Sequence, residues 1–372
     1  MLVAAPKVFL TFYSLICSNI FYEYMKNTIR NFNKIVIFIY NSPLLLEMIV
    51  KIDKIDKEIM YELDKNARAT YQEIAKKIKS KKDVVAYRFN RLMENNIIKK
   101  FVTVFALGKV HIFNFKIYFQ FQGLSESEEK RMLQDFIEDS QVIWVAKCEG
   151  RWDLMTSHYA RHVKEFAKIK DKIFEKYGKY VQDYSIIIND EAWILNRDYL
   201  VLNKPLQRKS LVYIGEVEDI TISEIDRELF HLISNNARFH ILDIAKKLNL
   251  DVKTVKQKIK KYEQLGFIEG YTTFFNLNNI GLKFFKIFIY VQEQSKKEYN
   301  SLFEFCRNRV NVIHLIKTLG PWELELEIEA ENIDYIHKLT KELRNKFPNI
   351  IKKIESVIIS DELKLDFFPE DF

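Results

Sequence analysis

The chain has 372 residues, enough for two or more domains that each bury a core of their own. It is 48% hydrophobic and 29% charged, with 9 Gly and 6 Pro, which excludes a collagen-like, low-complexity or intrinsically disordered chain. The net charge of +7 is modest for this length, so it bears on nucleic-acid binding only if the basic residues are concentrated in one region.

The N-terminal region contains two apolar runs, at 8–22 and 34–50, that are short for a transmembrane helix of about 20 residues. No small-residue cleavage pattern follows a basic stretch, so a signal peptide is not indicated. We interpret residues 1–47 as an apolar extension outside the fold and expect the folded protein to start at Met48. The alternative is a membrane-tethered protein that uses this extension as an anchor, which extraction dependent on detergent would favour.

A helical pattern begins after Met48. In "IDKEIMYELDKNAR" the apolar residues recur every four positions, and Asn66 is suited to end this helix in the left-handed conformation. Two further helices are expected in "TYQEIAKKI" and "KDVVAYRFNRLMENN", followed by a β-rich run at 97–105 after a turn at Asn96. Three short helices and a β wing predict a winged helix-turn-helix domain at 48–108.

The next region alternates strands and helices in the order β-α-β-β-α-β. "NFKIYFQFQ" and "YVQDYSIII" have the composition of the first and last strands, and two more strands flank Gly150. This order predicts a ferredoxin-like domain at 109–195. Residues 196–218 show no clear periodicity, and we interpret them as a connector.

The same succession of signals returns 170 residues later without a gap. "NAR" at 66–68 corresponds to "NAR" at 236–238, and "IAKK" at 74–77 to "IAKK" at 244–247. The period is too long for a solenoid repeat of about 20–50 residues. We therefore predict an α+β chain of two copies, with a second winged helix-turn-helix domain at 219–278 and a second ferredoxin-like domain at 279–372.

Basic residues are concentrated around the third helix of each winged helix-turn-helix domain. Residues 76–100 contain nine basic and two acidic residues, and residues 246–270 contain seven and three. Such patches bind DNA phosphates through counterion release, while Asn, Gln and Lys can read base edges. A lysine-rich face that is merely solvated is the alternative, but the repetition in both copies favours DNA. The residues expected to contact DNA are Lys81, Lys82, Tyr87, Arg88, Asn90, Arg91, Lys253, Lys256, Gln257, Lys258 and Lys260.

The two copies differ on this expected DNA-reading face. Asp83 in the first copy corresponds to Lys253 in the second, and Tyr87 corresponds to Gln257. We therefore expect half-sites of unequal sequence or unequal affinity. Arg88 and Arg91 are expected to hold phosphates rather than bases.

A second candidate site is the turn "CEGRWDL" and its counterpart "TLGPWEL". Backbone groups at the glycine could hold the carboxylate of a small zwitterion and the acidic residue its ammonium group. A β-turn whose Trp packs on the sheet edge is the alternative reading. The effector-binding candidates are Gly150, Trp152, Asp153, Gly320, Trp322 and Glu323.

Other patterns indicate no catalytic or metal site. No P-loop, dinucleotide fingerprint, nucleophile elbow or HExxH spacing is present, so we predict no enzyme activity, no metal and no cofactor. The alternating glutamates of "WELELEIEA" are expected on a solvated or lysine-paired sheet face, opposite a buried apolar face. The three cysteines lack disulfide or metal-ligand spacing and suggest buried thiols in a reducing compartment.

With both copies considered, the chain resembles the Lrp/AsnC (feast/famine) transcription regulators. The matching stretches are "IDKEIMYELDKNARATYQEIAKKI", "VVAYRFNRLMENNIIKKF" and "CEGRWDL" in the first copy, and "IDRELFHLISNNARFHILDIAKKL", "TVKQKIKKYEQLGFIEGY" and "TLGPWEL" in the second. The resemblance covers almost all of residues 50–365. With its two copies, the chain resembles tandem members of the family that archaeal genomes encode.

This resemblance implies a cytoplasmic regulator that binds double-stranded DNA, an amino-acid effector near the Gly turn, and effector domains that pair through their sheets. The duplication then supplies a fused pseudo-dimer, which we expect to be able to associate further. The chain departs from the family at the start of the recognition helix, where Lys81 and Asp251 stand in place of a common Ser. At the second Gly turn the acid is Glu323, and Pro321 precedes Trp322, so one or both effector sites are expected to have lost amino-acid binding and kept only the dimer role.

The alternative function is that of the siroheme decarboxylases, tetrapyrrole enzymes of the same fold. That activity would need basic and histidine side chains lining a pocket, and neither effector-domain pattern shows such a cluster. Bound tetrapyrrole colour without DNA affinity would favour it.

Overall fold

The computed structural model describes residues 50–202, 208, 210–292 and 295–369. The extension predicted at 1–47 lies outside the described residues, as does Cys17. Within the described ranges, the helices are all too short or too polar to span a membrane.

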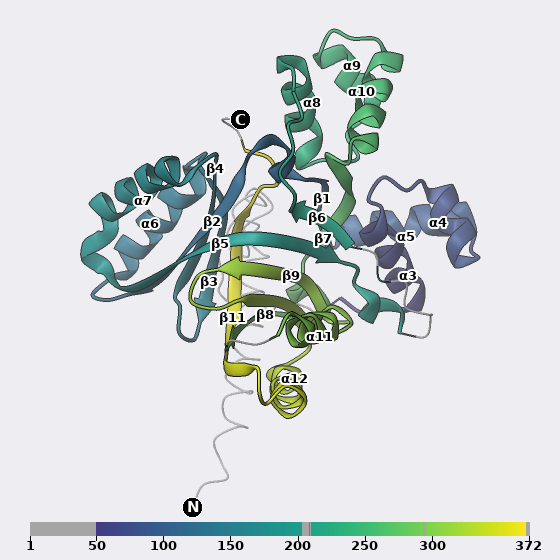
Figure 1. Ribbon diagram of the computed structural model, residues 1–372. Coiled ribbons are helices and arrows are strands. Elements are labelled where there is room, and N and C mark those ends of the chain that lie inside the picture. The colour runs from purple at the N-terminus through teal and green to yellow at the C-terminus, as the bar shows by residue number, and fades with distance from the viewer. Residues whose placement is uncertain (1–49, 203–207, 209, 293–294, 370–372) are drawn as a thin grey trace, which may run out of the picture. The chain divides into compact units, whose positions relative to one another are not determined.

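Two three-helix units, which we call head 1 and head 2, carry the helix-turn-helix segments (Figure 1). Head 1 comprises α3 (Lys54–Lys65), α4 (Tyr71–Ile78) and α5 (Lys82–Glu94), and head 2 comprises α8 (Glu224–Ser234), α9 (Ile241–Lys247) and α10 (Val252–Gln264). Capping boxes at Asp53 and Thr70 satisfy the first free N–H groups of α3 and α4. The predicted three-helix pattern is confirmed in both copies.

The backbone conformation predicted for the turn residues is correct at one pair of turns and wrong at another. Asn96 and Gly266 occupy equivalent turns at φ of 50° and 64°, as predicted. Asn66 ends α3 at φ −158°, so its predicted left-handed conformation is wrong. The Asn66 side chain accepts a hydrogen bond from the Arg68 N–H at 2.9 Å, and this local turn keeps the residue extended.

Each head contributes one wing strand, and the two strands pair with each other. β1 (Ile98–Phe105) and β7 (Ile268–Phe275) form an antiparallel two-stranded sheet. The sequence predicted a wing for each copy, and the structure corrects this to one ribbon shared by both. A single strand leaves its backbone groups unpaired, so pairing across the copies satisfies them.

The repeated "NAR" motif fastens each head to the wing strand of the other copy. The Ala67 N–H donates to the Tyr271 carbonyl at 3.1 Å, and the Ala237 N–H donates to the Phe101 carbonyl at 2.9 Å. Arg68 lies 5.0 Å over the Tyr271 ring, and its equivalent Arg238 lies 5.4 Å over Phe101. In both copies the motif thus joins a head to the wing strand of the other copy.

The two effector domains confirm the predicted β-α-β-β-α-β order. In the first copy the elements are β2 (Phe113–Phe121), α6 (Glu126–Glu138), β3 (Val142–Glu149), β4 (Leu154–Ala160), α7 (Val163–Tyr177) and β5 (Val181–Leu195). In the second they are β8 (Lys283–Val291), α11 (Lys296–Arg307), β9 (Val312–Leu319), β10 (Leu324–Ala330), α12 (Ile333–Lys346) and β11 (Ile351–Leu365).

The eight effector strands close into one sheet. Their order is β2-β4-β3-β11-β8-β10-β9-β5, and β2 also pairs with β5. The two copies are therefore joined at two seams, β3–β11 and β5–β9. Helices α6 and α7 cover the outside of the first copy's strands, and α11 and α12 cover the second copy's (Figure 1).

The closed sheet turns its polar positions inward. Leu324, Leu326 and Ile328 of β10 pack beneath the helices, while the intervening Glu325 and Glu327 are 0% and 7% exposed inside the sheet. Of the two environments predicted for these glutamates, the solvated sheet face is wrong and the lysine-paired sheet face is correct. A strand that alternates apolar and polar residues has two buried faces when its sheet closes on itself.

The predicted connector is largely built into the fold. Its 3-10 turn Asp198–Val201 (η3) is followed by β6 (Ser210–Ile214), which pairs with β5 and adds a ninth strand. Arg197 is 3% exposed and Asp198 is fully buried. Three more short turns, η1 (Leu107–Val110), η2 (Gly178–Tyr180) and η4 (Asn278–Ile280), complete the described elements.

Candidate nucleic-acid interface

Helix α5 buries one face in head 1 and exposes the other. Val85 and Leu92 are fully buried and Phe89 is 7% exposed, as the spacing predicted. Tyr87 is 68% exposed, an unusual position for an aromatic ring that serves only the core. The exposed polar residues predicted on this face are Lys81, Lys82 and Asn90.

Helix α10 repeats this arrangement in head 2. Val255, Ile259 and Tyr262 are buried, and the opposite face exposes Lys253, Lys256, Gln257 and Lys260. Within the described part of the chain, no hydrogen bond or ion pair engages any of these four side chains or those of Lys81, Lys82, Tyr87 and Asn90. They are free to meet a ligand.

Three other predicted DNA contacts are used inside the heads. Arg88 donates to Asp53 at 2.5 Å and to Asp56 at 3.2 Å, and Arg91 is also paired with Asp56. Lys258, the equivalent of Arg88, pairs with Asp226 at 2.8 Å. Because Asp56 and Asp226 are buried, these pairs fix the third helix against the first. The expectation that Arg88 and Arg91 hold phosphates stays a prediction, and in the structure both side chains already have carboxylate partners.

The two recognition helices begin differently. Asp251 caps α10 by accepting from the Thr254 N–H at 2.8 Å. Lys81 stands at the same place before α5 and makes no side-chain cap. The first turn of α5 thus combines backbone N–H groups without a side-chain cap, Lys82 and the exposed Asp83, and Lys81 precedes it.

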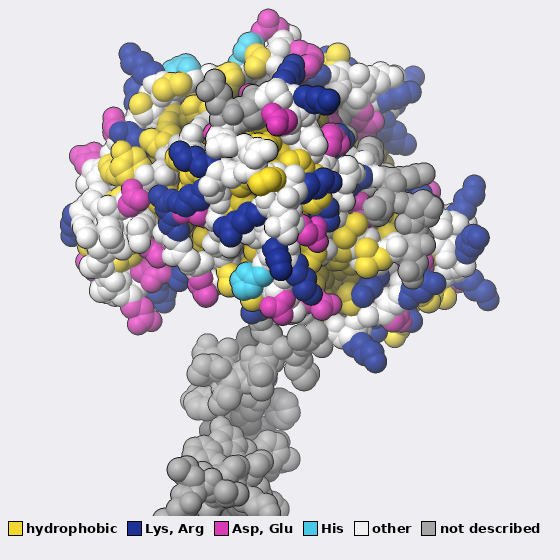
Figure 2. All heavy atoms as spheres, turned by 60° about the horizontal axis from the view of Figure 1, so that its bottom comes forward, with side chains coloured by type: hydrophobic (Ala, Val, Ile, Leu, Met, Phe, Trp, Pro, Cys, Tyr) yellow, Lys and Arg dark blue, Asp and Glu magenta, His cyan; other side chains and the backbone are white. Residues whose placement is uncertain are grey.

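Lysines and arginines line the margin of the molecule on the head 1 side. Figure 2 shows dark-blue side chains projecting at the right, the side on which α4 and α5 lie in Figure 1. The exposed basic residues of that part include Lys76, Lys79, Lys81 and Lys82. The basic residues concentrated in the sequence therefore reach the surface.

At the two Gly turns, Gly150, Asp153 and Gly320 are exposed, but the tryptophans expected to contact an effector are buried. Trp152 and Trp322 are 0% exposed and lie inside the closed sheet with Tyr118 and Phe288. The Trp322 indole N–H donates to Glu325 at 3.0 Å. Neither indole packs on a sheet edge, as the β-turn alternative expected, and neither is exposed to an effector.

The acidic residues at these turns hold strand ends. Asp153 accepts from the Phe121 N–H at 2.7 Å, and Glu323 accepts from the equivalent Val291 N–H at 2.5 Å. Gly150 has φ of 135°, and a Cβ there would lie 3.2 Å from the Val357 side chain. At Gly320 a Cβ would lie 3.2 Å from the Ile186 carbonyl oxygen. The turn residues are thus accounted for by packing.

A buried charge cluster inside the closed sheet was not foreseen. Lys116 Nζ lies 2.7 Å from Glu325, and Lys286 Nζ lies 3.1 Å from Glu325 and 2.8 Å from Glu327. His314 pairs with Glu327. Burial opposes ionisation of Glu325, but the two ammonium groups outweigh it and hold its pKa at about 2. Lys116 of β2 lies far in sequence from β8, β9 and β10, which supply the other side chains, so spacing could not reveal the cluster.

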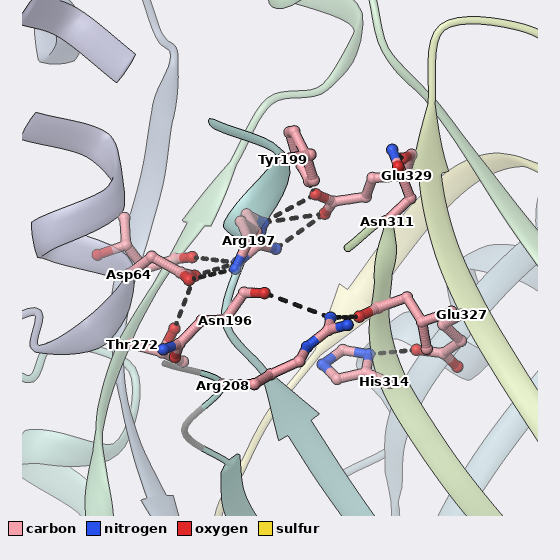
Figure 3. Close-up of polar contacts among 12 residues, drawn as sticks. Asp64, Asn196, Arg197, Tyr199, Arg208, Thr272, Asn311, His314, Glu327 and Glu329 are labelled. Atoms are coloured by element: carbon pink, nitrogen blue, oxygen red, sulfur yellow. Dashed lines mark hydrogen bonds and ion pairs between the residues drawn. The ribbon is translucent and has the colours of Figure 1, made fainter. Parts of the chain in front are cut away.

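A second buried network centres on Arg197 and joins three parts of the chain (Figure 3). Its guanidinium donates to Asp64 of α3 at 2.5 Å, to Glu329 of β10 at 2.8 Å and to the Thr273 carbonyl of β7 at 3.3 Å. Burial disfavours the charged guanidinium, but Glu329 and Asp64 outweigh it and raise the pKa of Arg197. Head 1 is thereby tied to the second copy's sheet.

Comparisons with known proteins agree with this arrangement. A family model described as "winged helix-turn-helix DNA-binding" matches residues 52–99 and 222–269. An uncharacterized HTH-type transcriptional regulator of Pyrococcus abyssi is 34% identical over 146 residues, covering 39% of this chain and 97% of the relative. The HTH-type transcriptional regulator LrpA of Pyrococcus horikoshii is 37% identical over 60 residues, 16% of this chain and 43% of LrpA.

Among solved structures, the siroheme decarboxylase NirDL is similar over most of the chain. The match covers 85% of this chain and 94% of NirDL with a TM-score of 0.56 and 11% identity. At this identity the likeness concerns the fold alone.

Proposed function

The chain belongs to the Lrp/AsnC family of HTH-type transcriptional regulators, and from this premise we propose that it works as a fused pseudo-dimer that reads DNA sequence with two unequal heads. The observation that carries the proposal is the pair of unengaged recognition faces on α5 and α10. Each is polar, basic and held rigidly by a buried opposite face.

The two heads should prefer different half-sites. Tyr87 and Asn90 stand on α5 where Gln257 and Lys260 stand on α10, so the groups that meet base edges differ. Lys81, Lys82, Lys253 and Lys256 supply phosphate contacts on either side. A single chain then binds an asymmetric operator in one orientation.

The proposed role is that of a cytoplasmic regulator without enzyme activity. Lys116 and His314 of the buried cluster adjoin a cavity of about 50 Å³, and His314 also lines a cavity of about 280 Å³. Pockets for drug-sized ligands enclose roughly 300–1,000 Å³, so the smaller cavity lacks room for a tetrapyrrole. The charged groups there are satisfied by Glu325 and Glu327.

Selection from a pool of random DNA duplexes tests the proposal. The full chain should enrich a motif made of two unequal parts, and Gln257→Ala should relax only the part read by head 2. Enrichment of no motif, or of a perfect palindrome, would count against two unequal reading heads.

A further inference from the structure

Helix α12 and the start of β11 border a cavity of about 370 Å³ in the second effector domain. The helix lies beside this end of the strand (Figure 1). We call the cavity the α12 cleft, and none of its described lining residues belongs to a head or to a Gly turn. Its polar walls include His337, Thr340, Lys341, Arg344, Asn345 and Ser356.

In the first copy, aromatic rings occupy the equivalent space between α7 and β5. Phe174 of α7 and Tyr184 of β5 meet edge to face, with their ring centroids 4.7 Å apart. One repeat later, the same two positions hold Arg344 and Ile354, and both line the α12 cleft. The two copies therefore differ here: an aromatic pair joins helix and strand in one, and a cavity lies at the same place in the other.

Three basic side chains of the α12 cleft lie on one side of the helix. His337, Lys341 and Arg344 are spaced at i, i+4 and i+7, which brings them to a common face of α12. All three are exposed, and none forms a hydrogen bond or an ion pair with another residue that the structure describes. The first copy has Ala167 and Asp171 at the first two of these positions, so the basic face belongs to the second copy alone.

Neutral donors complete the walls of the cleft. Thr340, Asn345 and Ser356 each carry a side-chain donor, and none of these groups is hydrogen-bonded to another described residue. Glu355 is the one acidic residue among the described lining residues, and Arg151 already pairs with its carboxylate at 2.9 Å. The cleft therefore offers positive charge and unused donors, which suits an anion with several acceptor atoms.

We propose that the α12 cleft binds the phosphate group of a small molecule. A phosphate monoester carries a charge of about −1.5 to −2 at pH 7 and three strong acceptor oxygens, so it engages several cations and donors at once. The Arg344 guanidinium matches two phosphate oxygens, and Lys341 adds a point charge. A carboxylate, with one charge and two oxygens, would leave most of these donors without an acceptor.

The cleft has room for more than the phosphate group. Its volume of about 370 Å³ lies within the range of small-molecule pockets, roughly 300–1,000 Å³. Ile354, largely buried beneath α12, gives the cleft an apolar wall that the organic part of a ligand can cover. A phosphorylated organic molecule should therefore bind more tightly than inorganic phosphate.

Calorimetric titration of the full chain in a phosphate-free buffer tests the proposal. The probes are inorganic phosphate, ribose 5-phosphate and adenosine monophosphate, with ribose and adenosine as the counterparts that lack phosphate. At least one of the two phosphorylated molecules should bind, and its counterpart should bind at least tenfold more weakly, since it lacks the charged group.

Two matched variants locate the binding. Lys341→Asp with Arg344→Phe installs the residues of the first copy and should weaken binding by roughly tenfold or more. The control pair Lys164→Asp with Lys168→Phe makes the same change of charge on exposed positions of α7 and should bind as the wild type does. Thermal unfolding checks that the cleft pair is folded, and the exposed single replacement Lys341→Asp gives the same decision if the pair is destabilised.

The proposal is overturned if neither phosphorylated molecule binds, if the counterparts bind as tightly, or if the cleft pair binds as the wild type does. Duplex DNA binding by the cleft pair should equal that of the wild type, because the heads are unchanged. Weaker DNA binding by the cleft pair, without any response of the wild type to the small phosphates, would assign the cleft to the DNA backbone instead.

Discussion

Basic side chains on a recognition helix are available to DNA only if nothing inside the protein engages them. Lys256 is exposed on α10 with no partner among the described residues, whereas Arg88 is held by Asp53 and Asp56. Sequence spacing places both on the third helix and cannot distinguish them, because the partner carboxylates lie on the first helix. The inward-facing residues were predictable, since helical periodicity alone determines them.

These two residues should therefore respond differently to replacement by alanine. Lys256→Ala should weaken DNA binding and reduce the slope of log affinity against log salt by about one, because one phosphate contact is lost. Arg88→Ala should instead destabilise head 1, since it removes one partner of the buried Asp56. Anisotropy over a salt series and thermal unfolding of each variant separate the effects. Equal salt slopes for Lys256→Ala and the wild type would refute the assignment.

His158 makes stability depend on pH. It is fully buried, with Nε2 2.9 Å from Thr156 Oγ1, and burial lowers its pKa to about 4. The unfolded histidine has a pKa of about 6.5, so it takes up a proton on unfolding. At pH 7 the histidine is mostly neutral in both the folded and the unfolded state, so it hardly affects the free energy of unfolding. This free energy falls as the pH drops from about 6.5 towards 4, because only the unfolded state takes up the proton.

Between pH 7 and pH 5 this histidine should cost about 1–2 kcal/mol of folding free energy. In His158→Gln that part of the pH dependence disappears, so the variant should lose less stability than the wild type over this range. Urea unfolding at both pH values measures the difference. Identical losses in the two proteins would show that the buried histidine does not titrate in this way.

At the scale of elements, the helices and strands of each copy follow from local patterns, but their partners do not. The pairing of β1 with β7, and the entry of β6 into the sheet, depend on the second copy being present. The connector lacks periodicity because Arg197 donates to Glu329 of β10, Asp198 accepts from Tyr61 of α3, and β6 pairs with β5. A sequence read one segment at a time gives no signal for such contacts.

The Arg197 network is asymmetric between the copies and can be tested as such. The positions equivalent to Asp64, Arg197 and Glu329 are Ser234, Phe367 and Tyr159, which form no ion pair among the described residues. Arg197→Phe alone leaves two buried carboxylates unpaired and should cost about 3–5 kcal/mol.

Adding Asp64→Ser and Glu329→Tyr to that variant should recover most of the lost stability, because the uncompensated charges are removed. Denaturant unfolding of the single and triple variants gives both values. A triple variant no more stable than Arg197→Phe would mean that the network is needed for packing as well as for charge balance.

At the scale of the whole molecule, the duplication explains the architecture. Eight effector strands close into one sheet through the seams β3–β11 and β5–β9, and the heads share the wing ribbon β1–β7. One chain thus contains the contacts that two separate copies would otherwise make. The resemblance to the Lrp/AsnC family implied the pairing of effector domains, but not that polar residues such as Glu325 and Lys286 would be enclosed between them.

The central claim is that this pseudo-dimer binds a particular DNA sequence through both heads. Fluorescence anisotropy of the full chain on its own upstream DNA, with salt varied and scrambled duplex as competitor, tests it most directly. We predict binding that survives the competitor and weakens steeply with salt, and that weakens further in Lys82→Ala and in Lys256→Ala alike. Binding that scrambled duplex abolishes equally, or that depends on only one of these lysines, would contradict the claim.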